Sequence, residues 1–531
     1  MKKRYLKLVA LMLSLGMVMG LSACGSDDID EELALIEEED DYDEDDEDFE
    51  EDEDGDFEEI LEGDDDYEEL APTKESISIT HTFEDSTDGG HVAEADSEEL
   101  YYTTSKIVKT GNAEGDEADF YGENAACLAT NGGTVDISKS IIETNGKHAN
   151  ALFSYGEGST VSISDSVIET TGDCSGGLMT TGGGTTTARN LRITTSGNSS
   201  AAIRSDRGGG TVEVDGGVYT TSGMGSPVIY STADITVTDA TMESTSSQGV
   251  VVEGKNSVTL EAVDLTADNN TQNSDKSDYY QAVMIYQSMS GDAAEGTASF
   301  TMSDSLLTNK KGDIFFVNNT VAVITLLNNE FINEDEDGVF LRAAGAGWGQ
   351  SGSNGGNVTL KVGEQVIDGD IIVDDVSTLN MYLASESEFR GAINPDGQAG
   401  DVYVEITGDS KWILTGDSYI SSLTCDASAI NLNGHKLYVD GKEYKAGTES
   451  SGEAVEAKVS EGGGMEAPPD GGQGDMGNPP DGAPGDGNPP DGEPPEKPDG
   501  DNGNPPEKPD GDSSGPGNGN PPDGEPPEKP E

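Results

Sequence analysis

The residues best suited to bind a sugar lie between positions 279 and 348. They are Tyr279, Tyr280, Tyr286, Phe340, Arg342 and Trp348. An aromatic ring can pack flat against the C–H face of a sugar ring, and a guanidinium can hold a carboxylate through two parallel hydrogen bonds. These residues therefore predict a carbohydrate-binding surface. Arg342 favours an acidic sugar, whereas the net charge of −78 favours a neutral one unless calcium bridges the charges.

Alternation along three expected strands determines which side chains reach that surface. Six residues are predicted to point inward: Val283, Ile285, Ile314, Phe316, Val339 and Leu341. Six are predicted to point outward: Met284, Tyr286, Phe315, Val317, Phe340 and Arg342. The outward strip is a binding surface if it is open, or a local second core if the glycine-rich residues 345–350 fold back over it. Both interpretations hold if a groove remains between this loop and the strip.

A short acidic turn offers oxygen ligands for a cation. Asn333, Asp335 and Asp337 match the first, third and fifth positions of a calcium loop, and Gly338 matches the glycine that follows them. Ala344 stands where such loops have a bidentate glutamate. The turn therefore predicts either a loose calcium site at Asn333, Asp335 and Asp337 or an ordinary solvated acidic turn.

Catalytic arrangements are scarce in the sequence. The four histidines, His81, His91, His148 and His435, show no spacing typical of a metal site or a catalytic triad. Carboxylates are abundant, but the sequence alone places no pair of them on opposite sides of a substrate. No catalytic residue is predicted, and the chain is expected to bind its ligand without cleaving it.

The candidate residues belong to a repeat that runs from about residue 134 to residue 441. Equivalent apolar positions are Val135, Val161, Thr187, Val212, Ile235 and Val258, at spacings of 26, 26, 25, 23 and 23 residues. Each repeat divides into three short strands separated by turns, and such a unit buries its apolar face only by stacking on its neighbours. The predicted fold class is all-β: a right-handed parallel β-helix, a solenoid with three strands per coil and about a dozen coils, flanked by disordered segments.

Three insertions interrupt the repeat near the candidate residues. They occupy residues 266–281, 287–297 and 343–357. The second and third follow the third strand of coils that are separated by one other coil, so they are expected at the same corner, ~10 Å apart. Insertions confined to one face of a solenoid often form its binding surface.

The first 24 residues are typical of a bacterial secretion signal. Basic residues precede a short apolar stretch, and the segment ends in Leu21, Ser22, Ala23 and Cys24, which resembles a lipoprotein lipobox. Lipidation of Cys24 would anchor the protein to the outer face of the bacterial cell membrane, and this lipid is the only membrane contact expected. The alternative is an ordinary cleaved signal peptide with an incidental cysteine.

The other boundaries follow from composition. Residues 25–74 are predicted to form an acidic disordered spacer, since residues 27–70 contain 30 Asp or Glu and no Lys or Arg. Residues 75–121 are expected to cap the N-terminal end of the solenoid, and residues 122–450 to form the β-helix. Residues 451–531, rich in Pro, Gly and Asp, are predicted to be a disordered tail.

Charge and cysteine content exclude some partners and linkages. With 28 basic residues and a net charge of −78, the chain has no basic patch for nucleic acid. Cys127, Cys174 and Cys425 are too few and too scattered for a disulfide framework. Cys127 aligns with Leu152 in the repeat, which predicts a buried free thiol. We expect an extracytoplasmic monomer.

The repeat pattern resembles that of pectate-lyase-like β-helix proteins. With Cys24, the acidic spacer and the Gly/Pro-rich tail, the chain is similar to β-helix surface lipoproteins of anaerobic Gram-positive bacteria, some of which bind plant polysaccharide with calcium and without catalysis. The paired arginines of pectate lyases and the clustered aspartates and Gly-His-Gly of polygalacturonases do not occur at matching positions. The resemblance implies non-catalytic binding of a plant or cell-wall polysaccharide. The alternatives are a polysaccharide lyase or glycoside hydrolase, and an adhesin or structural surface rod.

Overall fold

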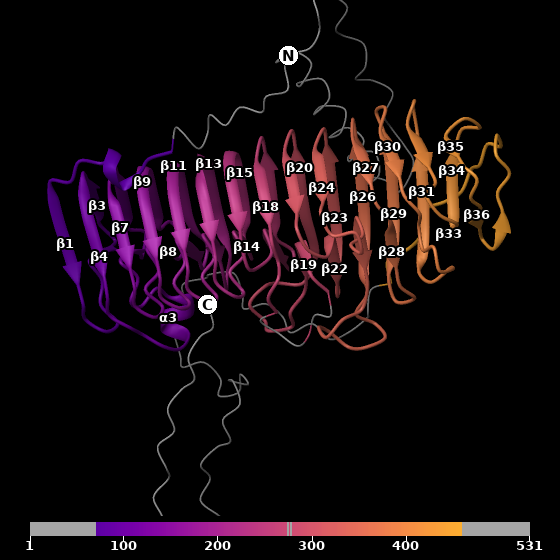
Figure 1. The fold of residues 1–531 in the computed structure, drawn as a ribbon. Helices are drawn as coiled ribbons and strands as arrows, with labels where there is room; N and C mark the ends of the chain where they lie inside the picture. Colours follow the sequence, from indigo (N-terminus) through magenta and orange to yellow (C-terminus); the bar gives the residue numbers. More distant parts are fainter. Residues whose placement is uncertain (1–70, 273–275, 277–278, 459–531) are drawn as a thin grey trace, which may run out of the picture. The chain divides into compact units, whose positions relative to one another are not determined.

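The computed structural model describes residues 71–272, 276 and 279–458. In this part of the chain, parallel strands stack coil upon coil, and helix is limited to two very short segments (Figure 1). The predicted all-β fold class, a parallel β-helix with three strands per coil, is confirmed. The signal segment with Cys24, most of the acidic spacer and the tail from residue 459 onward lie outside the described residues.

Sheet B contains the third strand of successive coils and has eleven strands. Its strands are, in spatial order, β2 (Ala93–Asp96), β5 (Cys127–Thr130), β8 (Leu152–Tyr155), β10 (Leu178–Thr181), β12 (Ile203–Ser205), β14 (Ile229–Ser231), β16 (Val250–Glu253), β19 (Gln281–Tyr286), β22 (Asp313–Asn318), β25 (Leu341–Ala343) and β28 (Ile371–Val373).

Sheet A contains the first strand of successive coils and, as far as residue 333, the second strand as well; it has nineteen strands. They are β1 (His81–Asp85), β3 (Glu99–Thr103), β4 (Ser105–Lys109), β6 (Thr134–Ser138), β7 (Ile141–Thr144), β9 (Thr160–Thr170), β11 (Gly184–Thr195), β13 (Gly210–Thr221), β15 (Asp234–Ser244), β17 (Ser257–Glu261), β18 (Asp264–Ala267), β20 (Thr297–Ser303), β21 (Leu306–Asn309), β23 (Thr320–Leu327), β24 (Glu330–Asn333), β26 (Gly356–Gly363), β29 (Thr378–Ala384), β31 (Asp401–Ile406) and β34 (Ser422–Cys425).

Two small sheets and two short helices complete the described fold. One sheet has four strands: β27 (Val366–Asp368), β30 (Glu388–Arg390), β32 (Lys411–Ile413) and β35 (Ile430–Asn431). The other has three: β33 (Ser418–Ile420), β36 (Leu437–Val439) and β37 (Lys442–Glu443). The helices are the 3-10 turn η1 (Lys74–Ser76) and α3 (Asp116–Phe120).

A single residue in the left-handed region turns the chain between the first and second strand of a coil. This residue is Asp165 in β9, with φ of 48°, and Asn190 in β11, with φ of 51°. Gly216 and Asp239 occupy the same corner of β13 and β15. Asn, Asp and Gly adopt left-handed backbone at lower cost than other residues. These residue types therefore mark the corner in the sequence.

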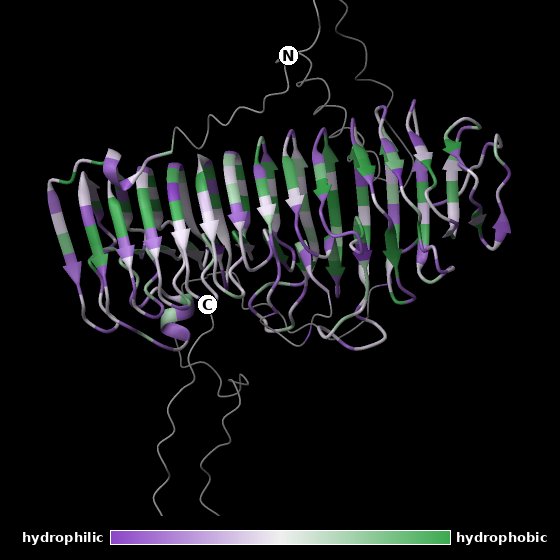
Figure 2. Ribbon diagram, in the orientation of Figure 1, coloured by the Kyte–Doolittle hydropathy of each residue, from purple (hydrophilic) through white to green (hydrophobic). Residues whose placement is uncertain are grey.

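Inward-facing side chains of successive coils form one continuous interior. Val135 pairs with Val161, which pairs with Thr186, and Thr186 pairs with Val212. All four are buried. Thr186, and not the predicted Thr187, holds the inward position in its coil. Figure 2 shows hydrophobic and hydrophilic residues alternating along many of the strands, as expected for strands with one buried face.

The β-helix begins earlier and extends further than predicted. β1 and β2 pair in parallel with β4 and β5, so residues 81–109, predicted as part of a cap, already build the first coil. At the other end, Asn380 makes two hydrogen bonds to the backbone of Val455, at 2.9 and 3.0 Å. Asn357 accepts another from the amide of Lys458 at 2.7 Å. Residues 451–458, predicted as tail, are therefore held against the β-helix.

The predicted positions of Phe315, Phe316 and Val317 in β22 are wrong, whereas Ile314 lies in the main interior as predicted. Phe315 faces the interior, and Phe316 faces outward beside Met284. Residues 314–317 are all apolar, so alternation along β22 carries no information about its phase. Pairing with β19 sets the phase instead, because Val283 lies opposite Phe315.

The interior position of Phe315 predicts a large loss of stability on truncation. Its ring contacts those of Phe300 and Phe340 at centroid distances of 5.6 and 5.5 Å. We expect Phe315→Ala to lower the free energy of unfolding by about 3–5 kcal/mol, because it leaves a cavity in a closely packed core. Ile332→Ala, at a residue that is 40% exposed on β24, should cost less than about 1 kcal/mol. Chemical denaturation of the two variants measures this, and equal losses would place Phe315 outside the core.

Candidate functional site

An outward row of apolar side chains runs across sheet B. Val251, Met284 and Phe316 lie side by side in register on β16, β19 and β22. Met284 is 3% exposed and Phe316 is fully buried, although both point away from the interior. The strip is therefore covered, and it forms a second, smaller core with Tyr286 and Ala344.

The first and third insertions supply the cover, with Tyr279, Ala344 and Trp348 packed against the strip. The amide of Gly347 donates a hydrogen bond to the carbonyl of Lys276 at 2.7 Å, which joins the first insertion to the third. Asn319 donates to the carbonyl of Gln287 at 2.9 Å and so holds the start of the second. Asn354 donates to the carbonyl of Trp348 at 2.7 Å and closes the third loop on itself. The first and third insertions thus meet over the strip, whereas the sequence had placed only the second and third at the same corner.

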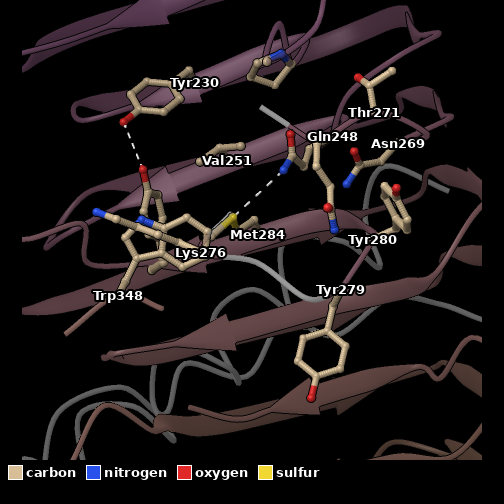
Figure 3. A pocket seen from close by; sticks show the side chains of 14 residues that line it. Tyr230, Gln248, Val251, Asn269, Thr271, Lys276, Tyr279, Tyr280, Met284 and Trp348 are labelled. Atoms are coloured by element: carbon tan, nitrogen blue, oxygen red, sulfur yellow. Dashed lines mark hydrogen bonds between the residues drawn. The ribbon is translucent and has the colours of Figure 1, made fainter. Parts of the chain in front are cut away.

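A cavity of about 210 Å³ remains between the loops and the strip (Figure 3). Tyr230, Val251, Met284 and Tyr286 come from the strands of sheet B. The other lining residues come from turns and insertions: Gly225, Pro227, Gln248, Asn269, Thr271, Gln272, Lys276, Tyr279, Tyr280 and Trp348. Five aromatic rings and several amide and hydroxyl groups therefore meet around one small space.

Hydrogen bonds fix the polar ends of the aromatic side chains at one side of the cavity. The hydroxyls of Tyr230 and Tyr286 lie 3.3 Å apart, and the Tyr230 hydroxyl also donates to the Glu253 carboxylate. The second oxygen of Glu253 accepts from the amide of Ser288 at 3.2 Å. Burial raises the pKa of Glu253 above its ordinary value, although its hydrogen bonds to Ser288 and Tyr230 oppose this. Glu253 thus orients Tyr230 from behind the cavity wall.

Two further contacts set the shape of the cavity. Trp348 meets Tyr286 edge to face, with ring centroids 5.2 Å apart. The Gln248 amide nitrogen lies 4.0 Å from the Met284 sulfur, a contact that spans the floor (Figure 3). The exposed parts of these side chains offer an apolar ring face next to amide groups, an arrangement suited to a ligand with one apolar face and several hydroxyls.

The structure brings four of the six predicted carbohydrate-binding residues together. Tyr279, Tyr280, Tyr286 and Trp348 all line the cavity. Phe340 does not, because it lies in the main interior at 1% exposure and contacts Phe331. It directly precedes β25 at a corner of the coil, where strand alternation does not apply.

Arg342 points outward, as predicted, but its guanidinium already has partners. Its Nε and Nη2 donate to the Asp313 carboxylate at 2.6 and 3.2 Å. The guanidinium also lies over the ring of Tyr279, 4.4 Å from the ring centroid. It does not line the cavity. The predicted grip on a sugar carboxylate is therefore replaced by an internal ion pair that supports Tyr279.

Sequence reasoning missed Tyr230, Gln248 and Asn269 as lining residues. The repeat contained a signal for Tyr230. Its register places Tyr230 opposite Val251, and Val251 in turn lies opposite Met284 in the outward row. Gln248 precedes a strand and Asn269 belongs to an insertion. Their positions depend on loop conformation, for which the repeat gives no register.

The acidic turn predicted to bind calcium has its own hydrogen bonds. Both Asp335 oxygens accept from backbone amides, those of Gly312 at 2.8 Å and Asp337 at 3.0 Å. The side-chain oxygen of Asn333 accepts from the Asp335 amide at 3.2 Å. Calcium binding at Asn333, Asp335 and Asp337 stays a prediction of the sequence.

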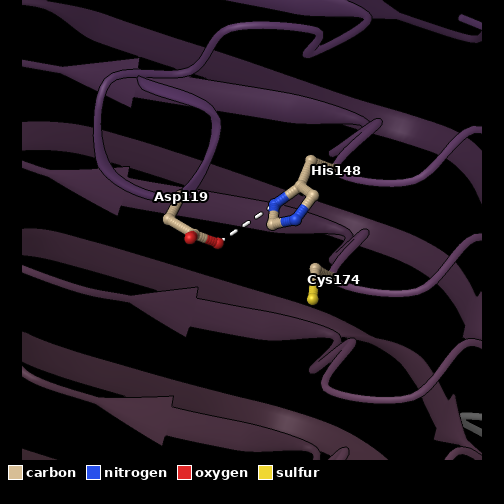
Figure 4. A group of neighbouring side chains, drawn as sticks. All are labelled: Asp119, His148 and Cys174. Carbon is tan, nitrogen blue, oxygen red and sulfur yellow. Dashed lines mark ion pairs between the residues drawn. The ribbon is translucent and has the colours of Figure 1, made fainter. Parts of the chain in front are cut away.

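A second cluster joins three residues that sequence reasoning did not connect. The Asp119 carboxylate lies 3.0 Å from Nδ1 of His148, and Cys174 lies on the other side of the imidazole (Figure 4). The donor atoms of Asp119, His148 and Cys174 all lie within 4.8 Å of one another. His148 and Cys174 are separated by 26 residues, the spacing that pairs Leu152 with Leu178. The repeat could therefore have linked His148 to Cys174, but Asp119 belongs to α3, outside the repeat.

The cluster holds His148 in its protonated form. Burial alone would lower the pKa of His148, but hydrogen bonds and charge interactions with Asp119 and Cys174 outweigh it and raise the pKa to about 9. The neighbouring charged groups are Glu114 and Lys147, which pair at 2.9 Å, and Arg204. His148 is buried, whereas Cys174 is partly exposed.

Comparison with known proteins gave no matching family model, no matching curated protein and no matching solved structure. Within residues 71–272, 276 and 279–458, no helix is long and apolar enough to cross a membrane. The assignment of function therefore depends on the geometry of the sites and on the sequence.

The ion pair between His148 and Asp119 predicts a pH-dependent stability. The pKa of His148 is about 9 in the folded protein and ~6.5 in an unfolded chain. Its contribution is thus fully present below about pH 6.5 and is lost as the pH rises through about 9. We expect Asp119→Asn to lower the melting temperature more at pH 6 than at pH 10. Thermal unfolding followed by circular dichroism measures this, and an equal decrease at both pH values would contradict it.

Proposed function

We propose that this protein is a lipid-anchored β-helix of the bacterial cell surface that binds polysaccharide without cleaving it. The observation that carries the proposal is the aromatic cavity on the outer face of sheet B. It combines the features that carbohydrate recognition requires: ring faces for the C–H side of a sugar, and amides for its hydroxyls. It also lies where the insertions interrupt an otherwise regular solenoid.

The size of the cavity favours a single sugar unit. Its volume of about 210 Å³ is below the ~300–1,000 Å³ of pockets that enclose drug-sized ligands. The neighbouring strip is covered, so a long chain cannot lie along it. We therefore propose that the cavity holds a terminal residue or a side branch of a glycan, with the rest of the polymer outside.

The charge of the lining favours a neutral or mildly acidic sugar. Its polar groups include the side chains of Gln248, Asn269 and Thr271, which are neutral, and of Lys276, which is the only charged residue among those that line it in the described chain. Arg342, the residue expected to select an acidic sugar, is paired with Asp313. A neutral plant or cell-wall glycan is the class of ligand that these groups match best.

The cell-surface part of the proposal rests on the sequence. Cys24 follows the lipobox-like Leu21-Ser22-Ala23 and lies outside the described residues. Calcium at Asn333, Asp335 and Asp337 would be a further ligand of the protein. Both statements rest on the resemblance to β-helix surface lipoproteins. The feature that this protein shares with them is the parallel β-helix fold.

Removal of the cavity's rings should abolish most glycan binding. We expect the described β-helix domain to be retained on at least one insoluble plant or bacterial cell-wall polysaccharide, and Trp348→Ala and Tyr286→Ala each to weaken binding about tenfold, or about 1.4 kcal/mol. Tyr101→Ala is the matched control, because Tyr101 is 68% exposed on β3, away from sheet B. Sedimentation with the polysaccharide, followed by quantification of free protein, measures the affinity.

Three results would overturn this assignment. If the folded wild-type domain is retained on no polysaccharide, the surface-rod alternative gains. If all three variants bind as well as the wild type, the cavity is only a packing defect under the loops. New reducing ends or unsaturated products in the supernatant would show cleavage and favour the lyase or hydrolase alternatives.

The lipid anchor can be tested separately. We expect Cys24→Ala to shift the protein from the membrane fraction to the soluble extracytoplasmic fraction, because it removes the only predicted site of lipidation. Immunoblots of fractionated cells, compared with cells that express the wild type, measure this. Unchanged membrane association would contradict anchoring through Cys24.

A further inference from the structure

We propose that Cys174 is a nucleophilic thiol that reacts with small disulfides, with His148 as its proton acceptor and Asp119 as the residue that positions His148. This activity is separate from the proposed glycan binding, because none of the three residues lines the aromatic cavity. The cluster combines a thiol, an imidazole and a carboxylate in the order required for nucleophile activation.

The order of the three groups is the first support for the proposal. The carboxylate of Asp119 lies 3.0 Å from Nδ1 of His148, and this contact fixes the ring and directs Nε2 to the opposite side, toward Cys174 (Figure 4). A base must be oriented by a third group and must lie near the nucleophile, and the three donor atoms lie within 4.8 Å of one another.

The β-helix itself holds two of the groups in place. His148 and Cys174 occupy the same turn of neighbouring coils, and the backbones of both are in the left-handed region, with φ of 56° and 54°. The His148 amide donates to the carbonyl of Asp173 at 3.0 Å, and the Cys174 amide donates to Asn198 of the next coil at 2.8 Å. Non-glycine residues with positive φ are uncommon, and this stack holds both side chains on the same side of the turn.

The charge around the cluster does not favour a bound metal ion. Lys147 and Arg204 both interact electrostatically with Cys174, and their positive charges oppose a divalent cation. Nδ1 of His148 is already engaged by Asp119, so a metal held between Cys174 and Nε2 would have only two ligands from this cluster. Structural zinc sites use four protein ligands and catalytic sites three.

The other two cysteines of the described chain provide a contrast. Cys127 is fully buried, and burial raises its pKa to about 12. Cys425 is 4% exposed, and burial also raises its pKa. Both belong to strands, β5 and β34, whereas Cys174 is in a partly exposed turn. All three thiols are free in the described chain, and the partner proposed for Cys174 is a disulfide from solution.

The reaction is a thiol–disulfide exchange. In the resting pair the proton of Cys174 already resides on His148, and the thiolate attacks one sulfur of the disulfide. A new S–S bond forms to Cys174, the old S–S bond breaks, and the departing thiolate leaves with the electron pair and takes up a proton. Cys174 is oxidised to the mixed disulfide while the small disulfide is reduced to one thiol, so electrons and protons balance.

The test compares all cysteines within one sample. The full chain carrying Cys24→Ala is treated with iodoacetamide between about pH 5.5 and 8.5, and alkylation of each cysteine is quantified by peptide mass spectrometry. At pH 7 we expect Cys174 to react at least about tenfold faster than Cys127 and Cys425. From pH 7.5 to 6 its rate should fall less than about threefold, whereas a thiol with an ordinary pKa of ~8.5 slows about thirtyfold. Cystine should form a mixed disulfide at Cys174 alone.

Two variants separate positioning from general damage. Asp119→Asn keeps the size of the side chain and should restore the steep pH dependence of an ordinary thiol. Glu114→Gln removes a nearby charge that pairs with Lys147 and should leave the profile unchanged. The low reactivity of Cys127 and Cys425 in the same digest confirms that each variant is folded.

Three outcomes would overturn the proposal. The first is a Cys174 rate no faster than that of the buried cysteines. The second is a steep wild-type profile, or the same profile in the wild type and Asp119→Asn. The third is full protection of Cys174 by an equimolar amount of zinc chloride, which would make the cluster a metal site instead.

Discussion

The parallel pairing of each coil with the next is the constraint on which the rest of the structure depends. A coil of three short strands cannot enclose a core by itself, so its apolar side chains are buried only when the neighbouring coil adds the same position ~4.8 Å away. The rows that result are visible in the pairings of Val135, Val161, Thr186 and Val212. Every side chain thereby acquires neighbours about one coil length away in the sequence.

The same pairing also aligns apolar side chains in rows on the outer face of the β-helix. These rows are buried only where another segment of the chain covers them. At the N-terminal end of sheet B the outward row consists of Leu128, Phe153 and Met179, which form a small core with Ala125. The end of α3 is held beside this row, since Thr181 of β10 donates a hydrogen bond to the carbonyl of Phe120 at 2.7 Å. Farther along, the row of Val251, Met284 and Phe316 is covered by the first and third insertions.

Charged residues occupy the outward row between these two apolar patches. Arg204 donates to Asp206 at 2.7 Å, both side chains are largely buried, and the guanidinium lies 5.8 Å from the ring centroid of Tyr230. A buried ion pair contributes little net stability, but the loss of one partner is costly. Arg204 thus lies between the two candidate sites. It contacts Tyr230, which lines the aromatic cavity, and it interacts with Cys174. The two candidate sites share one face of the solenoid but use different chemistry.

The sequence by itself determined the fold class, because a repeat of 23 to 26 residues with alternating apolar positions has few solutions other than stacked coils. It also located the insertions, and it identified Tyr279, Tyr280, Tyr286 and Trp348, since broken periodicity and outward alternation are local signals. It misplaced Phe315 and Phe340, because a strand that is apolar throughout has no visible phase and a corner residue does not alternate. Strand pairing settled both.

Only the tertiary structure decided whether the aromatic strip is open, which partner Arg342 takes, and that Asp119 meets His148 and Cys174. These outcomes depend on loops and on α3, which follow no repeat, so no spacing in the sequence reports their contacts. Arg342 was read as a sugar ligand because its acceptor, Asp313, is 29 residues away in the chain and becomes a neighbour only through the preceding coil. The sequence thus predicts the repeating part of the fold, whereas the candidate sites depend on segments that interrupt the repeat.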